Sequence, residues 1–243
     1  RVRKVLITGS SGMLGLSLSR LLLSAELLSG KKDLDLQNLD ATRKWLKYRQ
    51  YDVIIHLAAV TDLKLAEQNK QATYCLHAEV NNIFLKHCKK LIYVSTVPIW
   101  LKDSYIRSHY FDSKKSGEEI VLLKQNNAVL RTNIVGAGGL VGWATKELSG
   151  SKRIKGFKNS WFNPIHADQA SEQIASIIEE DKVGIVDAFG DVAVSKYDFL
   201  RQVAAKKNLR QDLIVETSLD KTQDLVWNVE GSNLSYNKCM ELI

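Results

Sequence analysis

The stretch Val5-Leu6-Ile7-Thr8-Gly9-Ser10-Ser11-Gly12-Met13-Leu14-Gly15 decides the fold of this chain. A short run of β-branched and aliphatic residues ends in Thr-Gly, two more glycines follow at three-residue intervals, and an apolar pattern with helical spacing continues to Leu23. This order predicts a strand, a tight turn and the start of a helix. Glycines let backbone N–H groups approach a phosphate closely, and a helix start presents unpaired donors and a positive dipole end. The stretch therefore predicts a site for the phosphates of a nucleotide.

The same glycines also suit an ordinary turn between any strand and helix. Their spacing, Gly-x-x-Gly-x-x-Gly, is one residue longer in its first gap than the dinucleotide fingerprint G-x-G-x-x-G. The place of the stretch favours the nucleotide site, because the first strand–helix junction is where a nucleotide-binding α/β fold needs a phosphate-binding turn.

Length and composition restrict the class of protein. A chain of 243 residues is expected to form one α/β domain, alone or with a smaller appendage. It contains no apolar run of roughly eighteen residues and no signal peptide before the first strand, so we expect a cytoplasmic protein without a membrane partner. Cys75, Cys88 and Cys239 form no C-x-x-C pair, which suits a reducing compartment and a place in the core.

The charge balance is basic, with 34 Lys and Arg against 27 Asp and Glu and a net charge of +7. Such a balance raises the question of nucleic-acid binding. The basic residues are spread along the chain in short pairs such as Lys31-Lys32 and Lys206-Lys207. We therefore expect a solvated surface that favours small anions, with no nucleic acid as a partner. Asp and Glu do not cluster as metal ligands do, so no metal site is predicted.

Apolar runs alternate with helical patterns over the first half of the chain. Buried strands are expected at 52–59, 91–96 and 128–131, and helices at 40–48, 79–89 and 113–124. The alternation predicts an α/β fold with a Rossmann-type doubly wound parallel sheet. A second strand is hard to recognise, because only Ser29-Gly30-Lys31-Lys32-Asp33-Leu34 stands between Leu28 and Asp35.

The pattern changes beyond Gly136, where glycines interrupt it and further helices are expected at 143–148, 168–180 and 195–208. We predict a dinucleotide-binding domain over residues 1–135 and a smaller, mixed substrate-binding lobe over 136–243, with part of 162–190 packing back on the first domain. Trp143 and Trp161 in this lobe suit either stacking on a base or sugar or core packing. The expected helix N-caps are Asp40, Asp168 and Ser195.

Tyr110 and Lys114 lie one helical turn apart, and of the eight tyrosines only Tyr110 has a lysine four residues on. An ammonium beside a phenol stabilises the phenolate, so the pair predicts a lowered Tyr110 pKa and proton exchange near neutral pH. Ser95 and Thr96 end a predicted central strand, where ligands sit in open α/β sheets. The alternatives are a surface helix start for the pair and a simple strand end for the hydroxyls.

Several of these motifs occur in the order seen in extended short-chain dehydrogenases/reductases, and the chain most resembles their dTDP-4-dehydrorhamnose reductase group. The motifs are Thr8-Gly9-x-x-Gly12-x-x-Gly15, His56-Leu57-Ala58-Ala59, Val94-Ser95-Thr96, Tyr110-x-x-x-Lys114, Leu130-Arg131-Thr132-Asn133 and Pro164-Ile165-His166-Ala167-Asp168. The segment Ala58-Ala59-Val60-Thr61-Asp62, followed by Ala66-Glu67, is similar to one characteristic of this group.

The resemblance implies a reductase that passes a hydride from NADP(H) or NAD(H) to the C4 ketone of a nucleotide-activated 4-keto-6-deoxy sugar, in cell-surface polysaccharide synthesis. The implied catalytic residues are Thr96, Tyr110 and Lys114. The implied cofactor-binding residues are Gly9, Gly12, Met13, Leu14, Gly15, Leu57, Ala58, Ala59 and Lys114. The implied substrate-binding residues are Val60, Thr61, Thr96, Asn133 and Trp143. A homodimer is also implied, because dimers are common among such proteins.

The chain departs from the group at several positions. Val97-Pro98-Ile99-Trp100 replaces the usual Asp-Tyr-Val-Phe, the stretch from there to Tyr110 is short, and His77 stands where asparagine is usual. His56 lies in an apolar strand and is expected to be a hydrogen-bonded core residue, and Lys31 and Lys32 are expected to be turn residues rather than ligands of a 2′-phosphate. The alternatives are a nucleotide-sugar epimerase and a non-catalytic regulatory subunit with this fold. A dehydratase is disfavoured, because Val97 takes the place of its acidic residue.

Overall fold

The computed structural model describes residues 3–96, 108–219 and 234–243. The described chain forms two compact units. The first unit takes in 3–96, 108–131 and 171–187, and the second takes in 132–170, 188–219 and 234–243. Each unit is described by itself below.

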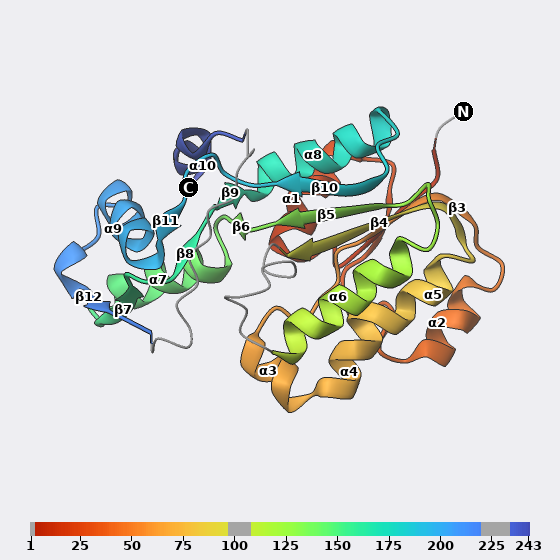
Figure 1. Cartoon of the computed structure of the whole chain (residues 1–243), viewed down its shortest axis with the longest axis horizontal. Helices are drawn as coiled ribbons and strands as arrows, with labels where there is room; N and C mark the ends of the chain where they lie inside the picture. The colour runs from red at the N-terminus through yellow and green to blue at the C-terminus, as the bar shows by residue number, and fades with distance from the viewer. Residues whose placement is uncertain (1–2, 97–107, 220–233) are drawn as a thin grey trace. The chain divides into compact units, whose positions relative to one another are not determined.

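A sheet of six strands forms the centre of the first unit in the described part of the chain, in the order β10-β5-β4-β3-β1-β2 (Figure 1). β1 pairs in parallel with both β2 and β3, and β3 pairs in parallel with β4. The strands are β1 (Val5–Thr8), β2 (Glu26–Leu28), β3 (Tyr51–His56), β4 (Cys88–Thr96), β5 (Ala128–Thr132) and β10 (Gly184–Ala188). The predicted α/β fold class is confirmed.

Helices cover both faces of this sheet. Figure 1 shows α1 and α8 on one side, and α2, α5 and α6 on the other. The helices are α1 (Met13–Leu21), α2 (Leu39–Leu46), α3 (Leu63–Gln68), α4 (Lys70–Tyr74), the π-helical turn η1 (Cys75–Glu79), α5 (Val80–Phe84), α6 (His109–Val121) and α8 (Ala167–Glu179). Because both faces are covered, all four residues of β1 and nearly all of β3 are buried, which explains their continuous apolar runs.

The main core lies between the sheet and the layer of α2, α5 and α6. Strand residues such as Leu6 and Ile54 meet helix residues such as Leu46, Phe84 and Val121, all fully buried. Burying such side chains stabilises the unit by roughly 1.5–3 kcal/mol each. The core therefore holds α6 against the sheet, which matters for the residues that α6 carries.

The order of the strands sets the place of a binding site. The chain runs from β1 to β2 on one side and returns to β3 on the other side of β1. In open α/β sheets, ligands bind beyond the carboxyl ends of the strands at such a reversal. The glycine turn after Thr8 and the segment after His56 both lie at this edge.

Several predicted boundaries are wrong. The second strand exists, as the three residues of β2, and it was hard to recognise because a short edge strand carries too few residues for a pattern. The helix expected at 79–89 ends at Phe84, and Cys88 already belongs to β4. The chain turns there because Tyr51 N–H bonds the His87 carbonyl and aligns the new strand.

Two predicted N-caps are also wrong. Asn38, not Asp40, caps α2, because its side chain accepts from the Ala41 N–H at 3.0 Å. Asp168 lies inside the first turn of α8, which begins one residue earlier. Ser195 does cap α9, with its hydroxyl accepting from the Asp198 N–H at 3.0 Å.

The second unit is built from short elements. It contains three two-stranded pairings, β11 with β8, β12 with β7 and β6 with β9, in the described residues. The elements are β6 (Ile134–Val135), α7 (Gly139–Ser149), β7 (Ile154–Phe157), β8 (Trp161–Phe162), β9 (Ile165–His166), β11 (Val194–Ser195), α9 (Lys196–Lys206), the 3-10 turn η3 (Gln211–Leu213), β12 (Ile214–Thr217) and α10 (Tyr236–Leu242). A core of its own, with Leu148, Leu200 and Ile214, holds α7, α9 and the β7–β12 pair together.

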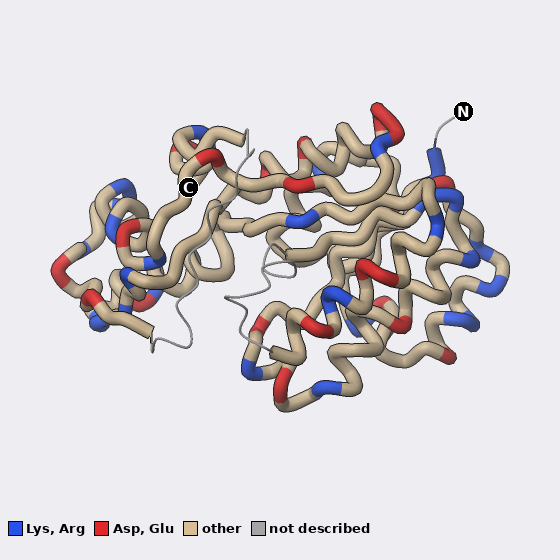
Figure 2. Tube along the Cα trace, viewed as in Figure 1, with Lys and Arg blue, Asp and Glu red and all other residues tan. Residues whose placement is uncertain are grey.

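Charged side chains are mixed over the surface. Figure 2 shows Lys and Arg interspersed with Asp and Glu in both units. Many of them pair, as Arg49 does with Glu26 at 2.8 Å and Lys89 with Asp52 at 2.7 Å. None of the helices that the structure describes is long and apolar enough to cross a membrane.

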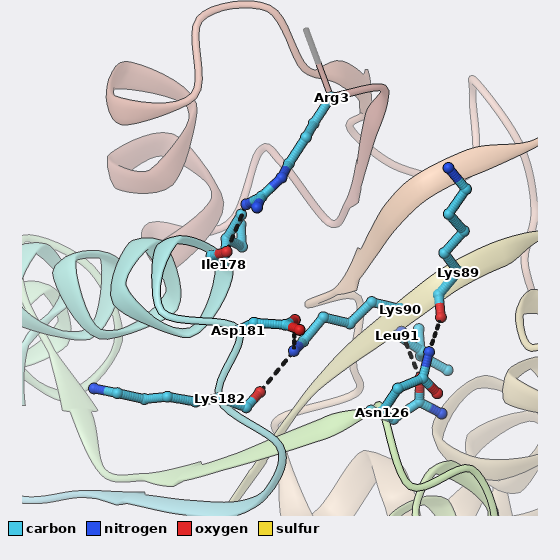
Figure 3. A network of polar contacts seen from close by, with 9 residues as sticks. Arg3, Lys89, Lys90, Leu91, Asn126, Ile178, Asp181 and Lys182 are labelled. Atoms are coloured by element: carbon cyan, nitrogen blue, oxygen red, sulfur yellow. Dashed lines mark hydrogen bonds and ion pairs between the residues drawn. The ribbon is translucent and has the colours of Figure 1, made fainter. Parts of the chain in front are cut away.

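A buried lysine ties β4 to the turn between α8 and β10 (Figure 3). The Lys90 ammonium donates to Asp181 Oδ1 and to the Lys182 carbonyl, each at 2.7 Å, while its side chain is 8% exposed. Arg3 donates to the Ile178 carbonyl at 2.5 Å beside it. Arg3 therefore satisfies a carbonyl in the last turn of α8, and Lys90 satisfies one in the turn that follows the helix.

We expect Lys90→Met to lower the free energy of unfolding by about 1–3 kcal/mol, because the partly buried Lys182 carbonyl loses a charged donor. Lys89→Met is the matched control, since Lys89 is 76% exposed and its pair with Asp52 is expected to contribute under about 1 kcal/mol. Urea denaturation of both variants measures the difference. Equal, small losses would contradict the role of Lys90.

Candidate active site

The glycine turn after β1 is built by close backbone contacts. Gly9 has φ +68°, and a Cβ there would lie 2.7 Å from the Ala58 nitrogen, so the turn and the segment after β3 touch. A Cβ on Gly15 would lie 2.5 Å from Ser10 Cα, which requires glycine where α1 passes the turn. Only glycine fits these two positions without a backbone shift.

Gly12 is different, because a Cβ there would meet one described atom within 4 Å, the Gly9 carbonyl oxygen at 3.2 Å. Gly12 is the N-cap of α1, and the described residues give this helix end neither a capping side chain nor an acidic residue in its first turn. The N–H groups at Met13, Leu14 and Gly15 thus begin a helix without a protein acceptor of the usual kind. The residues present fit a pyrophosphate, which needs donors and close backbone approach.

His56 joins the glycine turn to the neighbouring helix. The Ala58 N–H donates to Thr8 Oγ1 at 3.3 Å, and that oxygen lies 2.8 Å from His56 Nδ1. His56 Nε2 lies 2.9 Å from the Leu76 carbonyl, which can only accept, so the ring proton is on Nε2. Burial lowers the His56 pKa to about 3, and the ring is neutral. The prediction of a hydrogen-bonded core histidine is confirmed.

Tyr110 lies in the first turn of α6, beside two aromatic rings. Its ring meets the His77 ring edge-on at 5.6 Å and the Phe111 ring at 5.2 Å. Burial raises the pKa of Tyr110 to about 12. The predicted lowering by Lys114 is wrong in this structure, because desolvation disfavours the phenolate and the lysine ammonium is engaged elsewhere.

Lys114 is 4% exposed and reaches the end of β4. Its Nζ donates to the Val94 carbonyl at 2.9 Å and lies 4.8 Å from the centre of the Tyr93 ring. Burial lowers the Lys114 pKa to about 7, although the nearby Glu118 carboxylate acts in the opposite direction. The contact places α6 along the strand end that carries Thr96.

Gly117 and Glu118 hold α6 in this position. A Cβ on Gly117 would collide with the His77 carbonyl oxygen and lie 2.6 Å from the Tyr93 hydroxyl, so α6 and η1 touch through backbone. The Glu118 carboxylate, 4% exposed, accepts from Arg131 Nε at 3.0 Å and Nη2 at 2.6 Å. This bidentate ion pair joins α6 to β5.

The remaining predicted residues divide between the two units. In the first unit, Leu57, Ala58, Ala59 and Val60 follow β3 with partly exposed side chains, Thr61 is exposed, and Thr96 is partly exposed at the end of β4. Asn133 and Trp143 belong to the second unit, where the Asn133 carbonyl accepts from Ile165 N–H at 3.0 Å and Trp143 is 46% exposed. Val97, Pro98, Ile99 and Trp100 lie outside the described residues.

Four residues of this arrangement were not predicted as parts of the site. Ser113 bonds His77, Gly117 permits the close helix contact, and the pair Glu118–Arg131 supports the helix from behind. A glycine inside a helical pattern is a signal that could have identified Gly117. Ser113 carries no signal of its own, because serines near helix starts are common. Lys31 bonds Gln37 at 2.5 Å and pairs with Asp35, as a turn residue does.

The family model described as the RmlD substrate binding domain matches residues 3–242. This chain belongs to that family. The resemblance to the dTDP-4-dehydrorhamnose reductase group, predicted from the motifs, is thereby confirmed, and the family match extends over both units.

Three proteins that are similar to this chain carry the name dTDP-4-dehydrorhamnose reductase. A dTDP-4-dehydrorhamnose reductase of Aggregatibacter actinomycetemcomitans is 28% identical over 240 residues, covering 81% of this chain and 76% of the relative. The structure of a hypothetical dTDP-4-dehydrorhamnose reductase from Sulfolobus tokodaii has a TM-score of 0.77 and 26% identity, over 94% of this chain and 87% of that one. The Bacillus anthracis dTDP-4-dehydrorhamnose reductase, solved with NADP, shares the fold with a TM-score of 0.77 and 21% identity, over 90% and 85%.

We expect Gly117→Ala to destabilise this RmlD-family protein by roughly 1–3 kcal/mol, because the methyl group overlaps the backbone of η1. The usual gain from alanine in a helix, about 1 kcal/mol, acts in the opposite direction and is outweighed. Gly30→Ala is the control, since a Cβ there meets no described atom within 4 Å. Thermal unfolding of both variants tests this, and an unchanged or raised Tm for Gly117→Ala would contradict the close contact.

Lys114 should make stability depend on pH. Its pKa is about 7 in the folded chain and 10.5 when exposed, so between these values the unfolded chain binds more protons and stability rises with pH. Relative to Lys114→Met, the wild type should gain roughly 2–3 kcal/mol between pH 7 and pH 9.5. Well below pH 7, where the amine is protonated in both the folded and the unfolded chain, the gap should stay constant.

Urea denaturation at the two pH values measures this gap. Lys115→Met, which removes an exposed neighbour, serves as the control and should follow the wild type. A gap between wild type and Lys114→Met that stays flat with pH would mean that the Lys114 amine is not desolvated.

Proposed function

We propose that this protein is an NAD(P)H-dependent reductase acting on the C4 ketone of a nucleotide-activated 4-keto-6-deoxy sugar. Membership of the RmlD family and the relatives named dTDP-4-dehydrorhamnose reductase support the proposal. The observation that carries it is the arrangement of α6, which holds Tyr110 and Lys114 one turn apart and reaches the end of β4 through the Lys114–Val94 bond.

A nicotinamide cofactor, when bound, supplies the hydride that reduces the ketone carbon. We assign its pyrophosphate to the backbone of Gly9, Gly12 and the start of α1, because this turn offers donors and room for close approach. Leu57, Ala58 and Ala59 are assigned to the nucleoside halves, since Ala58 contacts the turn itself.

Tyr110 is assigned as the proton donor. A pKa of about 12 keeps its phenol protonated at neutral pH, which suits a group that must give a proton to the developing alkoxide. The proton would leave the phenol oxygen and form the new hydroxyl on C4, and the resulting Tyr110 phenolate would then take up a proton from solvent. Lys114 has a pKa of about 7, so its amine exists in both the protonated, charged form and the neutral form in this pH range.

Thr96 and Lys114 are assigned to orientation. The Thr96 hydroxyl, at the end of β4, would donate a hydrogen bond to the substrate carbonyl, and the Lys114 ammonium would hold the nicotinamide ribose. Positioning of this kind supplies a large part of catalysis by aligning the reacting groups before the reaction. Lys114 is suited to it because burial and its bond to Val94 fix the ammonium.

We assign the nucleotide sugar to the residues that the family resemblance implies, which are Val60, Thr61, Thr96, Asn133 and Trp143. An aromatic ring that is 46% exposed, as Trp143 is, suits stacking on a base or sugar. The product would serve cell-surface polysaccharide synthesis.

Turnover tests the proposal directly. Purified protein is mixed with NADPH or NADH and a panel of dTDP-, UDP-, GDP- and CDP-4-keto-6-deoxy sugars, and absorbance of the reduced cofactor is followed. Multiple turnovers with oxidation equal to product support the reductase. Inversion of the sugar without net oxidation would favour an epimerase, and tight cofactor binding without any turnover would favour a regulatory subunit.

Tyr110→Phe should lower kcat by about 10²- to 10⁴-fold, because it removes the proton donor. The ring contacts with His77 and Phe111 are kept, so cofactor affinity should change by less than about twofold. Tyr48→Phe removes the hydroxyl of a tyrosine that is 88% exposed and is the control. Normal turnover by Tyr110→Phe would show that Tyr110 is not the acid.

A further inference from the structure

His77 is a fully buried histidine whose two ring nitrogens contact different parts of the site. Its Nε2 lies 3.0 Å from the backbone nitrogen of Val60, in the segment after β3. Its Nδ1 lies 2.8 Å from the Ser113 hydroxyl, in the first half of α6. The ring itself meets Tyr110 edge-on at 5.6 Å.

The partners determine which nitrogen carries the proton. The Val60 N–H can only donate, so His77 Nε2 must accept and is not protonated. The Ser113 hydroxyl donates to the Tyr110 carbonyl at 2.9 Å, which leaves its oxygen free to accept from His77 Nδ1–H. Hydrogen bonds therefore run in one direction, from Val60 through His77 and Ser113 to the backbone of Tyr110.

The charged and titratable groups around His77 favour this neutral form. Burial lowers its pKa, and Lys114 and His109 of α6 and His56 of β3 act in the same direction. Tyr110 faces His77 with its aromatic ring. His77 and His56 are thus neighbouring neutral histidines of opposite tautomer, with the proton on Nδ1 in one and on Nε2 in the other.

The backbone of η1 keeps His77 in place. The His77 carbonyl accepts from Asn81 Nδ2 at 3.0 Å, and Gly117 of α6 packs directly against it. The backbone of His77 is therefore held in place while its two ring nitrogens bond the segment after β3 and α6. The proposed function uses both of these elements.

We propose that His77 is a positioning residue that couples the 57–60 segment to the helix carrying Tyr110. This rests on the proposed function, in which the segment binds cofactor and substrate and Tyr110 donates the proton. The Nε2 bond to Val60 holds the binding segment, and the Nδ1 bond to Ser113 orients the first turn of α6. Loss of the Nε2 bond to Val60 should weaken cofactor and substrate binding. Loss of the Nδ1 bond to Ser113 should slow turnover.

Two substitutions separate the two bonds. Asparagine places an amide N–H near the Nδ1 position, so His77→Asn keeps the donor to Ser113 and loses the acceptor for Val60. Glutamine places an amide oxygen near the Nε2 position, so His77→Gln keeps the acceptor for Val60 and loses the donor to Ser113. Each variant thus removes about one hydrogen bond.

Kinetics and binding give the first test. His77→Asn should raise KM and the cofactor Kd about tenfold with kcat within about threefold, as expected for one lost bond. His77→Gln should lower kcat about tenfold with cofactor Kd within about threefold. Proportional changes of kcat and KM in both variants would overturn the proposal, because that is the result of a merely structural role.

NMR of the wild type and of the His77→Gln and His77→Asn variants gives a test independent of activity. The ring ¹⁵N shifts of wild-type His77 should show the proton on Nδ1 at neutral pH. The Val60 amide should be protected from hydrogen exchange in the wild type and in His77→Gln, and should exchange at least about tenfold faster in His77→Asn. A proton on Nε2, or a Val60 amide equally protected in all three proteins, would overturn the proposal.

The two tests also separate this proposal from the proposed function. If no sugar is reduced by the wild type but the tautomer, Val60 protection and cofactor Kd behave as described, the coupling by His77 is supported and the reductase assignment fails. If the wild type is an active reductase and His77 carries its proton on Nε2, the reductase stands and the coupling is overturned.

Discussion

The burial of one lysine charge is the constraint on which the candidate site depends. Lys114 leaves water to bond the Val94 carbonyl and lie over the Tyr93 ring, and burial lowers its pKa to about 7. Burying an amine is costly unless the amine is hydrogen-bonded, so the position persists only because the surroundings hold it. Glu118, fixed in turn by Arg131, supplies a nearby negative charge. Burial of the Lys114 amine lowers the stability of the folded chain, and it keeps an ionisable group at the end of β4.

Neutral polar contacts complete what the lysine begins. Thr8, His56 and the Leu76 carbonyl connect the end of β1 to η1, and His77 connects η1 onward to α6. In each case the donor and acceptor types assign the histidine tautomer. Buried networks in which every ring nitrogen has a partner favour one arrangement, because any other would leave a buried polar group unpaired. These contacts thereby hold the glycine turn after β1 and the helix α6, which carries Tyr110, in one arrangement.

Local sequence was enough for features that short segments determine. The glycine turn, the buried strands and the four-residue spacing of Tyr110 and Lys114 follow from residue types and periods. The structure has a strand at each of the three predicted positions, although the one expected at 52–59 is β3 and ends at His56. The short strand β2, the π-helical turn at His77 and the contact at Gly117 were not recognised, because each is shaped by a partner distant in the chain. The Tyr110 pKa was predicted in the wrong direction, since spacing cannot report desolvation.

By itself, the sequence determined the class of fold, the family and the residue types available for chemistry, because hydrophobic periods and glycine positions act over a few residues. Only the tertiary structure decided that Lys114 bonds the Val94 carbonyl, and that His77 joins Val60 to Ser113. Those outcomes depend on burial and on backbone groups from separate strands and helices. Such groups meet only when the sheet and its helices have packed, so no local pattern encodes them.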